Sequence, residues 1–238
     1  MKTKKQIILT AAKAAFPPSL PIFAGFTFVG IAYGIYMKSL GFSAEYPILM
    51  SIFIFAGSMQ FVAAGLLTQA FAPLNAFLMT VMVNARHIFY GLSMLEKYRN
   101  VGKKKGFLIF GLCDETFSIN CTAAIPEQVN RGWFYFFVTL FDYCYWIFGS
   151  SLGGLFGTFL TFNTTGIDFV MTALFLVIFV NQWEKGKTHV SSLCGLGVSL
   201  VCLLIFGPGK FIPASMAGII ILLSALRKPL FRKTGDAE

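Results

Sequence analysis

The chain has 238 residues; 56% of them are hydrophobic, only 12% are charged, and 28 are phenylalanine. This composition, with a mean hydropathy of +0.73, excludes an ordinary soluble domain and indicates an integral membrane protein. The net charge of +9 does not indicate nucleic-acid binding, because the lysines and arginines form short clusters between apolar runs, as the loops of membrane proteins do.

Apolar runs fill most of the chain. At roughly 20 residues per helical crossing, this length holds seven or eight transmembrane helices and leaves no room for a separate soluble domain. The sequence therefore predicts an all-α, polytopic membrane protein with a single domain over residues 1–238. Residues 1–16 are predicted to form a basic segment at the membrane interface, and residues 227–238 a basic cytoplasmic tail.

The first two apolar runs differ in how they are interrupted. The first, over residues 19–37, is a predicted crossing, and it contains glycines that permit close helix packing or local unwinding, at Gly25, Gly30 and Gly34. The second, over residues 46–71, contains a small and polar patch at residues 56–61. Because freed backbone groups at membrane depth are tolerated only beside protein or water, we expect a broken helix here, as in many transporter sites. The candidate site residues in this patch are Gly57, Ser58 and Gln60.

The third apolar run, over residues 74–95, carries a cation and an imidazole about halfway along, at Arg86 and His87. At 100° per residue, one arc of a helix over this run is apolar and the other is not. The second arc consists of Asn84, Arg86, His87, Tyr90, Gly91 and Met94. Burying a cation at the bilayer centre costs roughly 2.5–3.5 kcal/mol, so such a residue usually faces a partner and marks a transport path.

Three carboxylates in later apolar runs are the candidate partners of Arg86. Asp114 and Glu115 lie in the fourth run, and Asp142 lies in the fifth. Each acid could form a static ion pair with Arg86 or a helix-terminus contact, or it could hold a proton or the ammonium group of a substrate. An acid left without a cation partner is a candidate proton carrier.

The remaining runs raise a question of topology. They cover residues 168–183, 190–207 and 211–226. If the basic N-terminus, the loops at residues 96–105 and 185–187 and the basic tail are all cytoplasmic, an even number of crossings must separate successive clusters. Three runs precede the first loop, and three more separate it from the second. Therefore one run in each group of three is re-entrant or split, or one basic cluster lies outside. A faint similarity between residues 49–61 and 170–182 hints at an internal repeat.

Enzymatic chemistry is not indicated by the sequence. His87 and His189 are far apart, and no zinc-protease, nucleophile-elbow or phosphate-loop pattern occurs. The five cysteines lie in apolar runs without paired spacing, which indicates neither a disulfide framework nor a metal site. The sequence therefore predicts no enzyme, no cofactor and no metal.

Several motifs follow one another along the chain in a specific order and spacing. They are Pro21-x3-Gly25-x4-Gly30-x3-Gly34, Gly57-Ser58-Met59-Gln60-Phe61, Asn84-Ala85-Arg86-His87 with Tyr90, Asp114-Glu115-Thr116-Phe117, Trp146, and Gly166-Ile167-Asp168-Phe169. Together they resemble the AzlC family, the large subunit of bacterial branched-chain amino-acid exporters, over residues 18–216. The resemblance implies a multi-pass protein of the bacterial cytoplasmic membrane, a small hydrophobic AzlD-type partner subunit, and export of leucine, isoleucine, valine or methionine. Met59 stands where relatives often carry a smaller residue, which leaves the substrate range open.

The residues and the resemblance together predict a secondary transporter that exports a zwitterionic aliphatic amino acid and is driven by the proton gradient. The candidate substrate-binding residues are Gly57, Ser58, Gln60, Asn84, Arg86, His87 and Tyr90. Arg86 or free backbone amides would hold the substrate carboxylate, while one of the three acids, Asp114, Glu115 and Asp142, would hold the ammonium group or the coupling proton. A channel or passive pore for a small polar solute and a structural subunit with an active partner are the alternatives.

Overall fold

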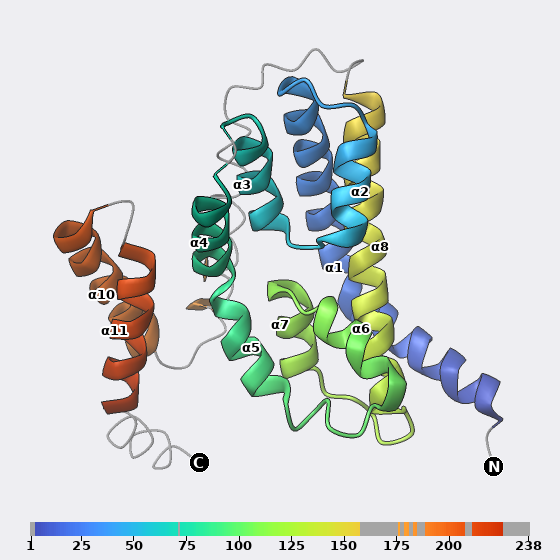
Figure 1. Ribbon diagram of the computed structural model, residues 1–238. Helices are drawn as coiled ribbons and strands as arrows, with labels where there is room; N and C mark the ends of the chain where they lie inside the picture. Colours follow the sequence, from blue (N-terminus) through green and yellow to red (C-terminus); the bar gives the residue numbers. More distant parts are fainter. Residues whose placement is uncertain are drawn as a thin grey trace. The chain divides into compact units, whose positions relative to one another are not determined.

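The computed structural model describes residues 3–70, 72–157, 176, 179–180, 183–184, 189–207 and 211–225. Every regular element in these ranges is a helix, which confirms the all-α prediction for them (Figure 1). The chain divides into two compact units, Met1–Leu174 and Phe175–Glu238, which are described separately. The single domain and the seven or eight crossings stay predictions.

The first unit contains eight described α-helices and one 3-10 turn. They are α1 (Lys4–Ser39), α2 (Glu45–Phe53), α3 (Gly57–Leu67), α4 (Pro73–Asn84), α5 (Arg86–Met94), η1 (Gly102–Lys104), α6 (Lys105–Phe110), α7 (Asp114–Thr122) and α8 (Arg131–Phe156). The second unit contains α10 (Val190–Phe206) and α11 (Phe211–Ala225), which pack on each other.

Helix α1 is the one described helix that is both long and apolar enough to cross a membrane by itself. A capping box at Thr3 starts it, and it continues without a break through three prolines. Residues 4–16 are therefore part of this helix, and they bury Ala11 and Ala15 completely in the core. Their placement at a membrane interface stays a prediction.

Helices α1 and α8 run parallel and form the centre of the first unit, held close by glycine. A Cβ atom added at Gly30 would lie 2.8 Å from the backbone nitrogen of Ser150, and one at Gly34 or Gly153 would overlap the opposite backbone. The predicted packing role is thus confirmed for Gly30 and Gly34. Gly25 faces open space instead.

Replacing Gly34 with alanine is expected to destabilise the protein by about 1–3 kcal/mol, because the added methyl group forces two helix backbones apart. The matched control is Gly25→Ala, which lies on the same helix, meets nothing within 4 Å and gains helix propensity. Thermal unfolding of the purified protein in detergent measures both. Equal melting temperatures for the two variants would contradict this account of the α1–α8 contact.

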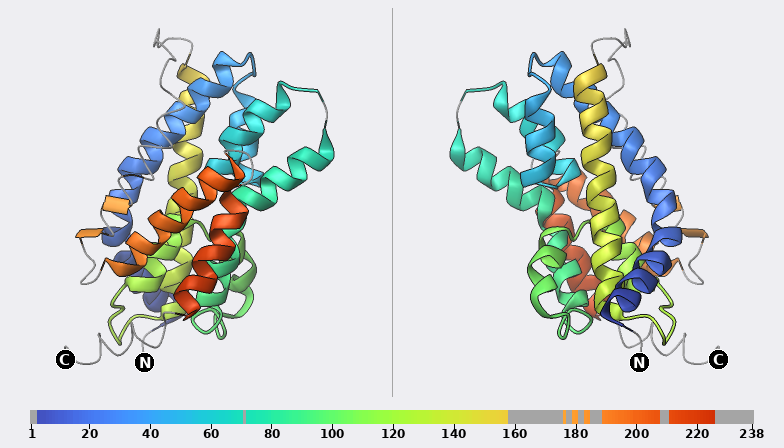
Figure 2. Two further views of the ribbon diagram at one scale, coloured as in Figure 1. Left: turned by 90° about the vertical axis from the view of Figure 1, so that its left-hand side faces the viewer. Right: turned by 90° about the vertical axis from the view of Figure 1, so that its right-hand side faces the viewer.

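Helices α2 and α3 form a hairpin that enters and leaves at the end where α1 finishes (Figures 1 and 2). The start of α2, at Pro47, lies against Gly154 near the end of α8, and the end of α3, at Gly65, lies beside Tyr36. The predicted broken helix is confirmed: α2 ends at Phe53, α3 begins at Gly57, and Phe55 between them has a φ of +43°. Such a backbone is strained for a non-glycine residue.

Helices α6 and α7 form a second hairpin that enters from the opposite direction, at the end where α1 and α8 begin. The side chain of Lys97 donates to the carbonyls of Asn120 (3.1 Å) and Cys121 (2.7 Å), which holds the end of α7 beside the loop that precedes α6. The break between the helices is made by Thr116, whose hydroxyl accepts from the Cys113 amide (2.8 Å) and donates to the Gly111 carbonyl (2.9 Å).

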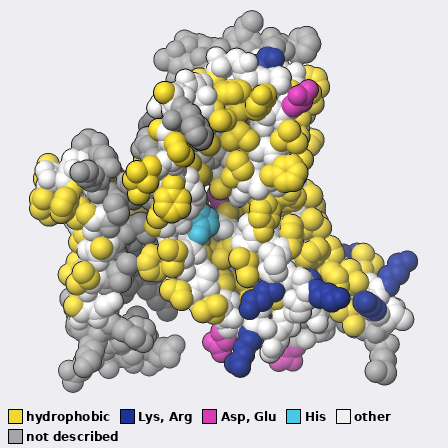
Figure 3. All heavy atoms as spheres, viewed as in Figure 1, with side chains coloured by type: hydrophobic (Ala, Val, Ile, Leu, Met, Phe, Trp, Pro, Cys, Tyr) yellow, Lys and Arg dark blue, Asp and Glu magenta, His cyan; other side chains and the backbone are white. Residues whose placement is uncertain are grey.

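We call the end where α1 and α8 begin the basic end, because most of the Lys and Arg side chains on the visible face of the first unit gather there, while hydrophobic side chains cover much of the rest (Figure 3). Helix α1 leaves this end and α4–α5 returns to it, whereas the α2–α3 hairpin starts and ends at the opposite end and the α6–α7 hairpin at the basic end (Figure 1). The second and the fourth apolar runs therefore turn back as re-entrant runs would. This arrangement is one of the alternatives that the basic clusters allowed.

Three predicted features cannot be compared with the structure. The sixth apolar run, at residues 168–183, lies almost wholly outside the described residues, and the proposed repeat at residues 170–182 and the basic tail at residues 227–238 lie there with it. The last two predicted runs correspond to α10 and α11.

Candidate substrate site

Three helix N-termini meet where the helices of the first unit are broken. Helix α3 begins at Gly57, α5 at Arg86 and α7 at Asp114. Arg86 joins them: its Nη2 donates to the Ser58 hydroxyl at 2.9 Å and pairs with an Asp114 carboxylate oxygen at 2.9 Å. The Arg86 and Asp114 side chains are 29% and 17% exposed. Asp114 is therefore the acid that pairs with Arg86, a choice that the sequence left open.

Tyr90 completes this ion pair from the next turn of α5. Its hydroxyl donates to the second carboxylate oxygen of Asp114, and its ring stacks on Phe117 with the centroids 4.5 Å apart. His87 lies edge-on to Tyr90 and keeps its Nδ1 3.2 Å from the carbonyl of Asn84. Four of the predicted site residues, Ser58, Arg86, His87 and Tyr90, thus lie in one connected group.

Gln60 occupies a different environment from the rest of the predicted site. It is completely buried, its amide donates to the Ser51 hydroxyl (3.1 Å), and its oxygen accepts from the Ala56 amide (3.2 Å) and the Trp146 indole (2.9 Å). The Trp146 ring also limits the space at Gly57, where a Cβ atom would lie 3.3 Å away. Gln60 therefore fixes the turn of the α2–α3 hairpin, and its contact with a substrate stays a prediction.

Trp146 and Tyr143 on α8 were missed as site residues by the sequence reasoning. Tyr143 donates to the Ile52 carbonyl (2.8 Å) and contacts both Phe55 and Phe110, one ring from the tip of each hairpin. Nothing in a stretch of closely spaced aromatic residues distinguishes Tyr143 from its neighbours, and Trp146 was named only as part of the family resemblance. They matter because the two hairpins enter from opposite ends and their tips meet against the middle of α8.

A cavity of about 450 Å³ opens beside the hairpin tips. Its walls come from the α2–α3 break at residues 54–56, from α5, and from the end of α6 at residues 109–112, and they are mostly aliphatic or aromatic. Asn84 and His87 are among the polar residues that line it. The side-chain oxygen of Asn84 is buried and has no hydrogen-bond partner among the described residues. The cavity thus offers an apolar space with an unused acceptor.

Asp142 lies apart from the Arg86–Asp114 pair. It is 0% exposed, and neither of its carboxylate oxygens has a hydrogen-bond partner in the part of the chain that the structure describes. Glu115 is near enough to interact with it electrostatically. The three predicted acids therefore divide into Asp114, which is paired with a cation, and a second group of Asp142 and Glu115.

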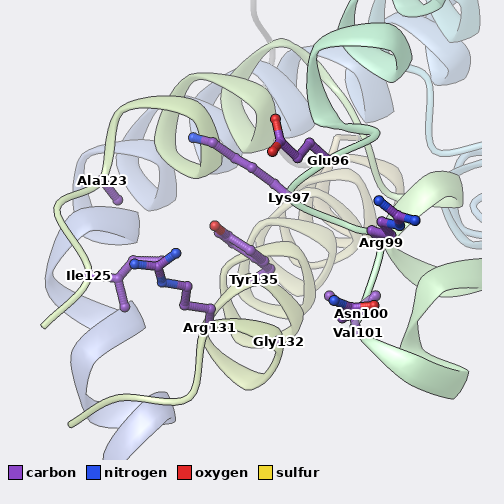
Figure 4. Close-up of a pocket in the computed structure, with 10 residues that line it drawn as sticks. All are labelled: Glu96, Lys97, Arg99, Asn100, Val101, Ala123, Ile125, Arg131, Gly132 and Tyr135. Carbon is purple, nitrogen blue, oxygen red and sulfur yellow. The ribbon is translucent and has the colours of Figure 1, made fainter. Parts of the chain in front are cut away.

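A second cavity, of about 710 Å³, lies at the basic end (Figure 4). Lys97, Arg99 and Arg131 line it together with Glu96, and none of the predicted site residues does. The ring of Tyr135 in this lining contacts that of Tyr98, which lines the first cavity. Burial raises the pKa of the Tyr98 phenol above its usual value, and its neutral hydroxyl accepts from the Asn120 amide at 2.9 Å. This cavity belongs to the surface of the basic end rather than to the hairpin tips.

Large exposed apolar side chains, among them Phe53, Leu74 and Phe77 at 73%, 71% and 63% exposure, are typical of a surface that contacts lipid. Broken helices whose ends meet around an ion pair are tolerated at membrane depth only where they are enclosed by protein or line a wet cavity. These features define an integral membrane protein built with discontinuous helices.

The chain belongs to the AzlC family. The family described as "AzlC protein" matches residues 21–160. The chain is 60% identical to the branched-chain amino acid transport protein AzlC of Bacillus subtilis, over 95% of this chain and 89% of the relative. It is 54% identical to an uncharacterized membrane protein of Haemophilus influenzae (91% and 89%) and 28% identical to the inner membrane protein YgaZ of Escherichia coli (74% and 73%). No solved structure matches the chain.

Proposed function

We propose that this chain is a multi-pass protein of the bacterial cytoplasmic membrane that exports aliphatic amino acids. In this proposal it acts with a small hydrophobic AzlD-type subunit, uses the proton gradient and catalyses no chemical reaction. The name of the Bacillus relative supports the substrate class. The observation that carries the proposal is Arg86, held between three helix N-termini beside an apolar cavity.

A zwitterionic aliphatic amino acid needs an anion site, a cation site and an apolar space. Arg86 and the first amides of α3, which no side chain caps, would hold the carboxylate, since helix N-termini favour negative charge. The unpartnered oxygen of Asn84 and the carboxylate of Asp114 would hold the ammonium group. The cavity beside the hairpin tips would take the aliphatic side chain of the substrate, because the residues that line this cavity are mostly aliphatic or aromatic.

The ion pair suggests how binding proceeds. In this structure Asp114 pairs with Arg86 at 2.9 Å. A substrate carboxylate would replace Asp114 on Arg86, and the released Asp114 would accept the substrate ammonium. The exchange keeps every buried charge compensated, which matters because an unpaired charge is costly in a low-dielectric site. Tyr90 would stay on Asp114 and limit how far this carboxylate moves.

Efflux from cells that lack other exporters tests the proposal. The cells are preloaded with a leucine- or valine-containing dipeptide and express this chain alone, the small partner alone, or both. Faster, saturable efflux of the free amino acid is expected only with both chains. Efflux that does not saturate would favour a passive pore, and equal efflux with the partner alone would favour a structural role for this chain.

A further inference from the structure

The most unusual group in the first unit is a carboxylate with nothing to compensate it. Asp142 lies in the middle of α8, is 0% exposed and has no hydrogen-bond partner among the described residues. Thr139, one turn earlier on the same helix, is also 0% exposed, and its hydroxyl oxygen is likewise unpartnered there. A bare carboxylate in such a place costs several kcal/mol. The site therefore needs a cation or a proton.

The tip of the α6–α7 hairpin covers these two residues. Gly111, at the start of the break, lies against the methyl group of Thr139. Glu115, in the first turn of α7, interacts electrostatically with Asp142, and so does the thiol of Cys113. Two carboxylates this close do not both ionise readily, because each disfavours the charge of the other.

Arg86 interacts with Glu115 but is paired with Asp114, and among the described residues no basic side chain bonds to Asp142. Helix α1 packs along α8 but has no titratable residue between Lys13 and Tyr33, and the α2–α3 hairpin has none after Tyr46. Hard metal cations such as calcium and magnesium take about six or more oxygen ligands. The described residues contain no group of three or more His, Cys, Asp or Glu side chains that could hold a metal ion, so the ligand set fits a proton better.

We propose that Asp142 and Glu115 form a shared proton site, separate from the substrate site, and that this site couples export to the proton gradient. The inference rests on the proposed function. An arriving proton forms an O–H bond on one of the two carboxyl groups. The pair then holds one negative charge instead of two, and the proton leaves toward the other side of the membrane.

Helix α7 links this proton site to the substrate site. Asp114 and Glu115 are adjacent in its first turn: Asp114 contacts Arg86 and Tyr90, and Glu115 interacts electrostatically with Asp114 and Arg86 and also with Asp142. Protonation removes a negative charge from the site, where Glu115 also interacts with Asp114 and Arg86. Proton binding therefore changes how firmly Asp114 holds Arg86 and how readily a substrate replaces it.

Proteoliposomes that contain the chain and its small partner test this coupling. Leucine counterflow, measured without any gradient, reports the substrate site alone. Leucine movement driven by an imposed pH gradient, with proton flux followed by an internal pH dye, reports the coupling. Asp142→Asn and Glu115→Gln are expected to keep counterflow and lose pH-driven movement with its proton flux. The matched control is Glu127→Gln, an exposed acid in the loop before α8, which should keep both.

The outcomes separate the two proposals. Absence of counterflow by the wild-type protein would overturn the proposed function and this inference with it. Normal counterflow together with undiminished pH-driven movement in Asp142→Asn, or in Glu115→Gln if the first variant does not fold, would overturn the inference alone. Leucine movement driven by a sodium gradient and indifferent to pH would also overturn it.

Discussion

Arg86→Ala is expected to abolish amino-acid export while the protein remains inserted in the membrane. The substitution removes the group that joins α3, α5 and α7 through Ser58 and Asp114. Truncating one partner of a buried, hydrogen-bonded charge pair typically costs about 2–5 kcal/mol, which is roughly 30-fold or more in affinity. Efflux from dipeptide-loaded cells, normalised to the amount of protein in the membrane, measures the loss.

A control must separate substrate binding from the structural cost of leaving Asp114 without a cation. The double variant Arg86→Ala/Asp114→Ala removes both charges, so it should recover stability but not export. Arg86→Lys keeps the charge but loses the fork of donors that reaches two partners at once, and we expect partial export at best. Arg99→Ala, an exposed arginine at the basic end, should export normally. Recovery of export by the double variant would reduce Arg86 to a structural ion pair.

The two re-entrant hairpins differ in how far the sequence could predict them. The α2–α3 break was predicted because residues 56–61 combine glycine, serine and glutamine within an apolar run. The α6–α7 break also falls in a small and polar patch, at residues 111–116, but the two acids in it were predicted as partners of Arg86 and not as a break. The α6–α7 break depends on hydrogen bonds of the Thr116 hydroxyl with Cys113 and Gly111. A threonine in the sequence does not by itself indicate such bonds. The spacing of basic clusters allowed either one re-entrant or split run in each group of three or one basic cluster on the outer side, and it did not indicate which run turns back.

The division of the acids was also beyond the sequence. Asp114 and Glu115 are neighbours, so no pattern could tell which of them meets Arg86. The answer depends on how the hairpin tip is turned, and this is fixed by tertiary contacts such as that of Gly111 with Thr139. The residues of the site were predictable because charges inside apolar runs are rare. Their partners were not, because partners come from packing between segments far apart in the chain.

Gln60→Leu is expected to be the most destabilising single substitution in the α2–α3 hairpin. Leucine has a similar size but leaves the Trp146 indole, the Ala56 amide and the Ser51 hydroxyl without their present partner. Each buried polar group left unsatisfied costs about 1–3 kcal/mol, so the total is about 3 kcal/mol or more. Thermal unfolding in detergent measures the loss, and Gln69→Leu, an exposed position just beyond α3, is the matched control.

The same variant decides between the two roles that Gln60 could have. If Gln60 positions the hairpin, Gln60→Leu lowers stability and export together, and Trp146→Phe, which removes one of the three hydrogen bonds while keeping a ring, produces a smaller decrease of both. If Gln60 binds substrate directly, Gln60→Leu unfolds like the wild-type protein but loses export. Since all its polar atoms already have partners inside the core, we expect the first result: the hairpin that presents the α3 N-terminus to the substrate depends on a glutamine that the substrate does not touch.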